Sequence, residues 1–174
     1  LLPILAVLLL TACASAPAST ATPAPTETPA STAATLTLEQ KVGQLFIVRP
    51  DALDLTLSQE TIDDPRADGV TQVTDAMRET LQQYPVGGIC QFGKNIESPS
   101  QLARFNKDLQ AASATPLFIT VDEEGGMVAR LANNDAFDLP RYASAAAVGA
   151  SGDPENARAM GQTIGGYLKT YGFN

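Results

Sequence analysis

Short apolar segments alternate with helical patterns along most of the chain, and this alternation constrains the fold more than any other feature. The segments are rich in apolar and β-branched residues, which predicts buried strands at 45–48, 86–92 and 117–121. Apolar residues at helical spacing predict helices at 70–84, 98–112 and 153–168. Because strand and helix alternate, we expect a parallel sheet with right-handed crossovers, and the fold class is α/β.

Two parallel architectures fit this order: an open doubly wound sheet and a (β/α)8 TIM-type barrel. A nucleotide-binding doubly wound sheet is disfavoured, because no G-x-G-x-x-G follows the first strand and no GxxxxGK[ST] occurs anywhere. A complete barrel takes about 250 residues. We therefore expect the 174 residues to be a fragment that forms the first part of a barrel, truncated after about three βα units.

The residues before the predicted fold resemble a targeting signal and a linker. The apolar run 1–10 is too short to span a bilayer, and it leads into Leu10-Thr11-Ala12-Cys13, which resembles a bacterial lipobox. We predict a signal peptide and lipobox at 1–13, with lipidation of Cys13. The alternative is an ordinary secretion signal with a chance Cys. Residues 14–35 are almost all Ala, Ser, Thr and Pro, which predicts a disordered linker, and the folded part is 36–174.

Composition and charge exclude several classes of function. The net charge is −8 and the basic residues are scattered singly, so we predict no nucleic-acid partner. The sequence has no His, which excludes a His-based metal site, triad or proton shuttle within these residues. Two cysteines, Cys13 and Cys90, make neither a disulfide framework nor a zinc site. We predict no metal and no cofactor.

The stretch 116–130 (PLFITVDEEGGMVAR) is the best candidate for a functional site. Polar, charged and glycine residues follow its apolar strand: Asp122, Glu123, Glu124, Gly125, Gly126 and Arg130. Ligands bind at the carboxyl ends of parallel strands, and glycines let the backbone turn sharply there. On residue types alone, a ligand site and a solvated acidic turn remain equally open.

Four blocks of the sequence resemble successive blocks of glycoside hydrolase family 3. They are EQKVGQLF at 39–46, GGICQFGKN at 87–95, QLARFNKDLQ at 101–110 and the stretch 116–130. The last block is similar to the β-N-acetylhexosaminidase branch, in which an Asp and EGG are followed by an Arg. The resemblance implies a (β/α)8 barrel and a retaining exo-glycosidase that removes terminal β-linked N-acetylhexosamine from peptidoglycan- or chitin-type saccharides.

The same resemblance assigns roles within the acidic stretch. It implies that Asp122 accepts hydrogen bonds from sugar hydroxyls, that Arg130 contacts the same sugar, and that Glu124, Gly125 and Gly126 support the turn. The family's nucleophilic Asp and acid/base His are expected beyond Asn174, so we expect no catalytic residue among these residues and an inactive fragment.

Other functions remain open at this point. A barrel that has lost its reacting groups would be a non-catalytic sugar-binding lipoprotein, and a β-glucosidase of the same family is a further alternative. A sugar-phosphate or nucleotide enzyme is disfavoured, because the chain lacks a phosphate loop. For the glycosidase and for the sugar-binding lipoprotein alike, the expected partners are a saccharide and a membrane surface, which the protein reaches through a lipid anchor. The expected location is the bacterial cell surface or periplasm.

Overall fold

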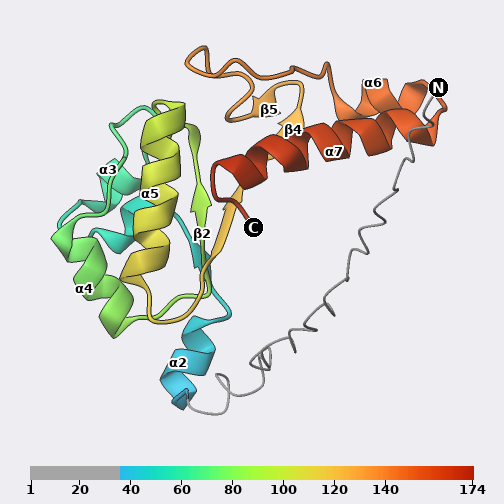
Figure 1. The fold of residues 1–174 in the computed structure, drawn as a ribbon. Helices are drawn as coiled ribbons and strands as arrows, with labels where there is room; N and C mark the ends of the chain where they lie inside the picture. Colours follow the sequence, from blue (N-terminus) through green and yellow to red (C-terminus); the bar gives the residue numbers. More distant parts are fainter. Residues whose placement is uncertain (1–35) are drawn as a thin grey trace, which may run out of the picture. The chain divides into compact units, whose positions relative to one another are not determined.

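The computed structural model describes residues 36–174, which form one compact unit (Figure 1). The predicted signal at 1–13, the linker at 14–35 and the lipidation site Cys13 lie outside the described residues, so they stay predictions. None of the helices within 36–174 is both long and apolar enough to cross a bilayer.

Three parallel strands form the central sheet, in the order β1-β2-β3. They are β1 (Ile47–Val48), β2 (Gly88–Gln91) and β3 (Phe118–Val121). All three predicted strands are therefore present, although each is shorter than its apolar segment. The register places Ile47, Gly88 and Phe118 side by side.

Helices alternate with these strands as predicted. The α-helices are α2 (Leu38–Gly43), α3 (Gln59–Asp63), α4 (Asp75–Gln83), α5 (Pro99–Ala112), α6 (Ala145–Ala150) and α7 (Pro154–Thr170). Two short 3-10 turns, η1 (Pro50–Leu53) and η2 (Gly93–Asn95), follow β1 and β2. The side chains of Thr37, Ser98 and Asp153 accept backbone hydrogen bonds and so cap the starts of α2, α5 and α7.

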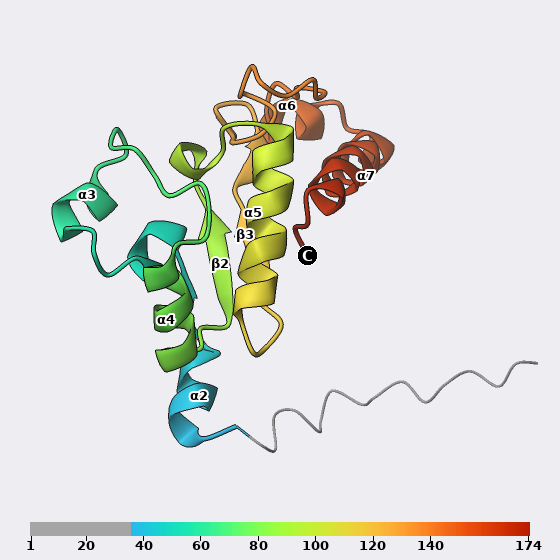
Figure 2. The same cartoon turned by 60° about the vertical axis from the view of Figure 1, so that its left-hand side comes forward.

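The hydrophobic core lies between one face of the sheet and the helices α4 and α5 (Figures 1 and 2). Side chains of β2 and β3 meet side chains of these helices and are almost fully buried: Ile89, Ile119, Met77, Leu81, Leu102, Phe105 and Leu109. The other face is open among the described residues, where Ile47 and Phe118 are 52% and 62% exposed on either side of Gly88. In a (β/α)8 barrel the helices cover the outer face of the sheet, and the inner face packs against side chains of the other strands.

The helix predicted at 70–84 begins later than its apolar spacing indicated. Residues 70–74 are not helical. The Val70 N–H donates to the buried Asp51 carboxylate at 3.1 Å, and Thr74 is the N-cap of α4, where its hydroxyl accepts from the Met77 N–H. Three other regular elements lie where no helix or strand was predicted: α3, α6 and a hairpin of β4 (Glu123–Gly125) and β5 (Val128–Ala129).

Candidate functional site

A pocket of about 330 Å³ lies where the chain leaves the carboxyl ends of the parallel strands. Its lining comes from the residues after β1, the α3 region, the residues after β2 and the end of the hairpin: Arg49, Ile62, Asp63, Pro65, Phe92, Gly93, Lys94 and Arg130. The elements β2, α3, β4 and β5, near which this lining lies, are labelled in Figure 1. The carboxyl ends of the strands form the edge of a parallel α/β sheet where ligands bind.

Asp122 and Arg130 lie together at this edge. Asp122 directly follows β3, and the β4–β5 hairpin returns the chain so that the Arg130 N–H donates to the Asp122 carbonyl at 3.3 Å. Arg130 Nη2 is 3.7 Å from Asp122 Oδ2, and the two side chains are 34% and 48% exposed. Arg130 Nε is buried and has no hydrogen-bond partner among residues 36–174. Because the pair is loose and partly open, both groups keep hydrogen-bonding capacity for a polar ligand.

Glu123 is buried and anchors the hairpin. The residue is 9% exposed, and its carboxylate accepts hydrogen bonds from the N–H groups of Leu131 and Ala132 and from Tyr167 Oη, each at 2.9 Å. Burial, together with this contact, raises the pKa of Tyr167 well above its ordinary value, so its hydroxyl stays a donor. Glu123 therefore connects the acidic turn to α7.

Glu124, which the resemblance assigned to supporting the turn, is exposed. None of the side-chain hydrogen bonds within residues 36–174 involves it, and the carboxylate that bonds to Leu131, Ala132 and Tyr167 is that of Glu123. Strand alternation is the signal that could have found this, since successive side chains of a strand point to opposite faces. We did not predict a strand at 123–125, so the alternation could not be applied.

Gly125 and Gly126 both adopt left-handed conformations, with φ of 83° and 64°. The Gly126 N–H donates to the carbonyl of Tyr142 at 2.8 Å, and a Cβ at this position would lie 2.6 Å from the carbonyl oxygen of Ala143. A side chain at residue 126 is therefore opposed both by φ and by space. The supporting role assigned to these two glycines thus has a physical basis.

Sequence reasoning missed three charged residues of the pocket: Arg49, Asp63 and Lys94. Arg49 Nη2 donates to Asp63 Oδ1 at 2.6 Å. The hydrogen bond from Gln59, followed by that from Arg49, lowers the pKa of Asp63. Lys94 reaches the carbonyl groups at the end of α3. Lys94 belongs to the block at 87–95, within which the sequence analysis assigned it no role.

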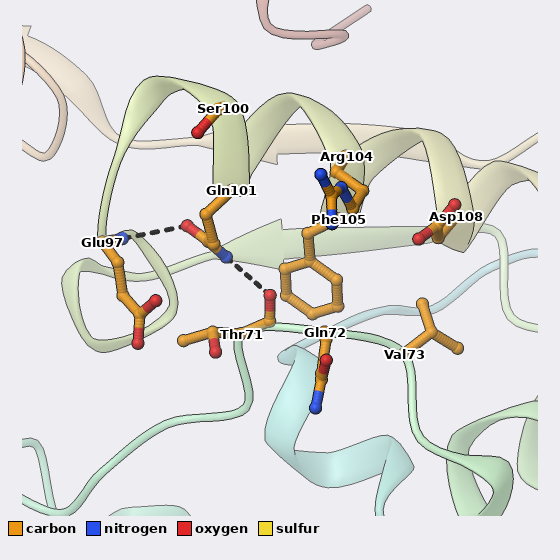
Figure 3. A pocket seen from close by; sticks show the side chains of 9 residues that line it. All are labelled: Thr71, Gln72, Val73, Glu97, Ser100, Gln101, Arg104, Phe105 and Asp108. Atoms are coloured by element: carbon orange, nitrogen blue, oxygen red, sulfur yellow. Dashed lines mark hydrogen bonds between the residues drawn. The ribbon is translucent and has the colours of Figure 1, made fainter.

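A second hollow, of about 310 Å³, runs along α5 and is shown in Figure 3. Gln101 lies in it and donates to the Thr71 carbonyl at 2.6 Å, while its Oε1 accepts from the Glu97 N–H at 3.0 Å. Ser98 caps α5 but forms no capping box with Gln101, because the Gln101 side chain accepts from Glu97, the residue before the cap. The lining comes from α5 and residues 71–73 rather than from strand ends, so this hollow lacks the position expected of the functional site.

The described part of the chain offers no group of three or more His, Cys, Asp or Glu side chains arranged to hold a metal ion. The chemistry available at the first pocket is that of carboxylate acceptors and guanidinium donors. These groups suit a ligand with several hydroxyl groups, because a carboxylate accepts two hydroxyl hydrogen bonds and charged acceptors make the stronger ones.

Comparisons with known proteins point in the same direction. A family model described as glycosyl hydrolase family 3 N terminal domain matches residues 37–174. A β-hexosaminidase of Thiobacillus denitrificans is 36% identical over 96 residues, which are 55% of this chain and 26% of that protein. A β-hexosaminidase A of Pseudoalteromonas piscicida is 30% identical over 110 residues, which cover 60% of this chain and 18% of that protein.

A solved structure is similar as well. The glycoside hydrolase family 3 β-N-acetylglucosaminidase of Paenibacillus sp. str. FPU-7 matches with a TM-score of 0.63 and 33% identity, over 80% of this chain and 23% of that one. Together with the parallel sheet, this likeness confirms the predicted fold class, the first part of a (β/α)8 TIM-type barrel. The chain spans between 18% and 26% of the length of these three relatives.

Proposed function

Because the chain belongs to the glycosyl hydrolase family 3 N-terminal domain family, we propose that the intact protein is a β-N-acetylhexosaminidase. It removes terminal β-linked N-acetylhexosamine from peptidoglycan- or chitin-type saccharides. The observation that carries this proposal is the Asp122–Arg130 pair at the ends of the strands. The relatives named β-hexosaminidase and β-N-acetylglucosaminidase support the choice of sugar.

The proposed mechanism is retaining, with a covalent glycosyl-enzyme intermediate. Asp122 accepts hydrogen bonds from two hydroxyls of the terminal sugar, and Arg130 donates to the same sugar. Such bonds accelerate the reaction where they strengthen in the transition state. The sequence has no His, so in this proposal the acid/base His and the nucleophilic Asp come from sequence beyond Asn174. Asp122 is assigned to binding only.

The test is an assay of the full-length protein on an aryl β-N-acetylglucosaminide and on the matching aryl β-glucoside. We expect turnover of the first and little of the second. Turnover of only the β-glucoside would contradict the assigned sugar. Saccharide binding without turnover of either substrate would favour the alternative of a non-catalytic sugar-binding protein.

We also propose that the protein is a secreted lipoprotein, anchored to a membrane surface through Cys13. The support is the order of apolar run, small residues and Cys in 1–13, followed by the Ala/Ser/Thr/Pro segment 14–35. Such a segment suits a tether that keeps the barrel away from the lipid surface.

We expect the full-length protein in the membrane fraction of a bacterial host, and Cys13→Ser in the soluble fraction. The reason is that a lipid chain on Cys13 would supply the anchor, while a serine accepts no such modification. Fractionation followed by immunoblotting measures this, with Cys90→Ser as the matched control. A membrane-bound Cys13→Ser variant would show that Cys13 is not the anchor.

A further inference from the structure

Lys94 forms an internal cation site in the wall of the pocket. Its Nζ donates to the carbonyl oxygens of Thr61, Ile62 and Asp64 at 3.1, 3.2 and 3.2 Å. Asp51 Oδ1 lies 3.6 Å from the same nitrogen. The side chains of Lys94 and Asp51 are only 9% and 1% exposed. Three carbonyls and one carboxylate thus surround a buried ammonium group.

The carboxylate of Asp51 is itself held from two further sides. Its Oδ1 accepts from the Val70 N–H at 3.1 Å, and its Oδ2 accepts from Asn95 Nδ2 at 2.9 Å. Asp51 lies just after β1, Asn95 lies just after β2, and Val70 is where the long excursion after β1 returns. The cluster therefore connects the ends of β1 and β2 to each other and to residue 70, at the end of the long connection that follows β1.

The three carbonyls belong to the last residues of α3 and the residue just after it. Carbonyl groups at the end of a helix have no intrahelical partner, and a cation stabilises them. An ammonium group has three donors, and all three are used here. Lys94 is therefore not available to bind an anionic ligand, even though it lines the pocket.

Lys94 holds residues 61–64, which form one wall of the pocket, and this wall has little other support. Helix α3 has five residues, of which only Ile62 is buried, and so short a helix is not stable by itself. Arg49 also pairs with Asp63 on the lining of the same pocket, but these side chains are 34% and 57% exposed, and exposed pairs stabilise little. The position of the wall relative to Arg130, on the lining of the same pocket, depends mainly on Lys94.

We propose that Lys94 is a positioning residue for the saccharide site. By holding residues 61–64 at the end of β2, it sets the shape of the pocket beside Asp122 and Arg130, and with it the affinity for the sugar. This inference rests on the proposed function, because the ligand it positions is the saccharide. Lys94 acts through the wall and touches no reacting atom, so it influences KM more than kcat.

The test uses two variants of the full-length protein. Lys94→Met keeps an apolar side chain of similar length, and Lys94→Ala leaves the space among the three carbonyls and Asp51 empty. For both we expect KM for the aryl β-N-acetylglucosaminide to rise about tenfold, since small misplacements in a site have effects of this size or larger, with a smaller change in kcat. Hydrogen exchange of residues 59–69 should accelerate in both. Propylammonium should restore the KM of Lys94→Ala, because it replaces the missing stem and charge, whereas the uncharged 1-propanol should not.

The matched control is Lys107→Met on the exposed side of α5, for which we expect wild-type KM and exchange. Unchanged KM and hydrogen exchange in Lys94→Met would overturn the inference. So would a raised KM of Lys94→Ala that propylammonium fails to lower. If the wild type binds N-acetylglucosamine without turnover, the proposed activity fails while the inference is decided by the dissociation constants of the same variants. If the wild type neither turns over nor binds the sugar, both are overturned.

Discussion

Replacing Asp122 by Ala in the full-length protein is expected to lower kcat/KM for an aryl β-N-acetylglucosaminide by about 10³-fold. A hydrogen bond to a charged group is worth roughly 1.5–3 kcal/mol, so the loss of the two proposed hydroxyl contacts corresponds to about 4 kcal/mol, or a factor of about 10³. Asp122→Asn should lose less, because the amide oxygen still accepts one hydroxyl. Steady-state kinetics on the purified variants measure both effects.

The fold should survive either change at Asp122. Its side chain is 48% exposed, and its ion pair with Arg130 is long at 3.7 Å, so it contributes little to stability. The control is Asp138→Asn, at an exposed position of the connection before α6, for which we expect wild-type kcat/KM. A normal kcat/KM in Asp122→Ala, or an equal loss in the control, would contradict the proposed role of Asp122 in sugar binding.

The sheet could be predicted because its signals are local. Each strand is a short apolar run. The helix caps at Thr37, Ser98 and Asp153 are local in the same sense, because each depends on residues within one helical turn. The segment 70–74 could not be predicted in the same way. Its valines have helical spacing, but the Val70 N–H bonds to Asp51, 19 residues earlier, and this long-range contact overrides the local pattern.

The same distinction separates the parts of the candidate site. Asp122 and Arg130 stand next to a predicted strand and within one block of a family resemblance, so sequence was sufficient to bring them together. Lys94 was missed because its carbonyl partners lie 30 to 33 residues away in the chain. Backbone carbonyls carry no residue identity, and no sequence motif marks them as partners of a lysine.

Replacing Glu123 by Ala is expected to lower the free energy of unfolding by about 4 kcal/mol. The change leaves the N–H groups of Leu131 and Ala132 and the hydroxyl of Tyr167 without their acceptor, and each unpaired buried donor costs about 1–3 kcal/mol. The apparent melting temperature should fall by roughly 10 °C, on the scale of 2–4 °C per kcal/mol for domains of this size. Hydrogen exchange at residues 131 and 132 should accelerate most, because these amides lose the bond directly.

The neighbouring Glu124→Ala is the control that separates burial from charge, because it removes one carboxylate from the same strand at an exposed position. We expect its melting temperature to stay near wild type, and equal losses in the two variants would contradict the assigned contacts. Tyr167→Phe removes one of the three donors and should cost about 1 kcal/mol at neutral pH. The pKa of Tyr167 is raised in the folded protein, so above about pH 10, where an unfolded tyrosine loses its proton, the folded state still binds it and stability falls as pH rises. Tyr167→Phe lacks this titration, so its alkaline loss of stability should be smaller than that of the wild type.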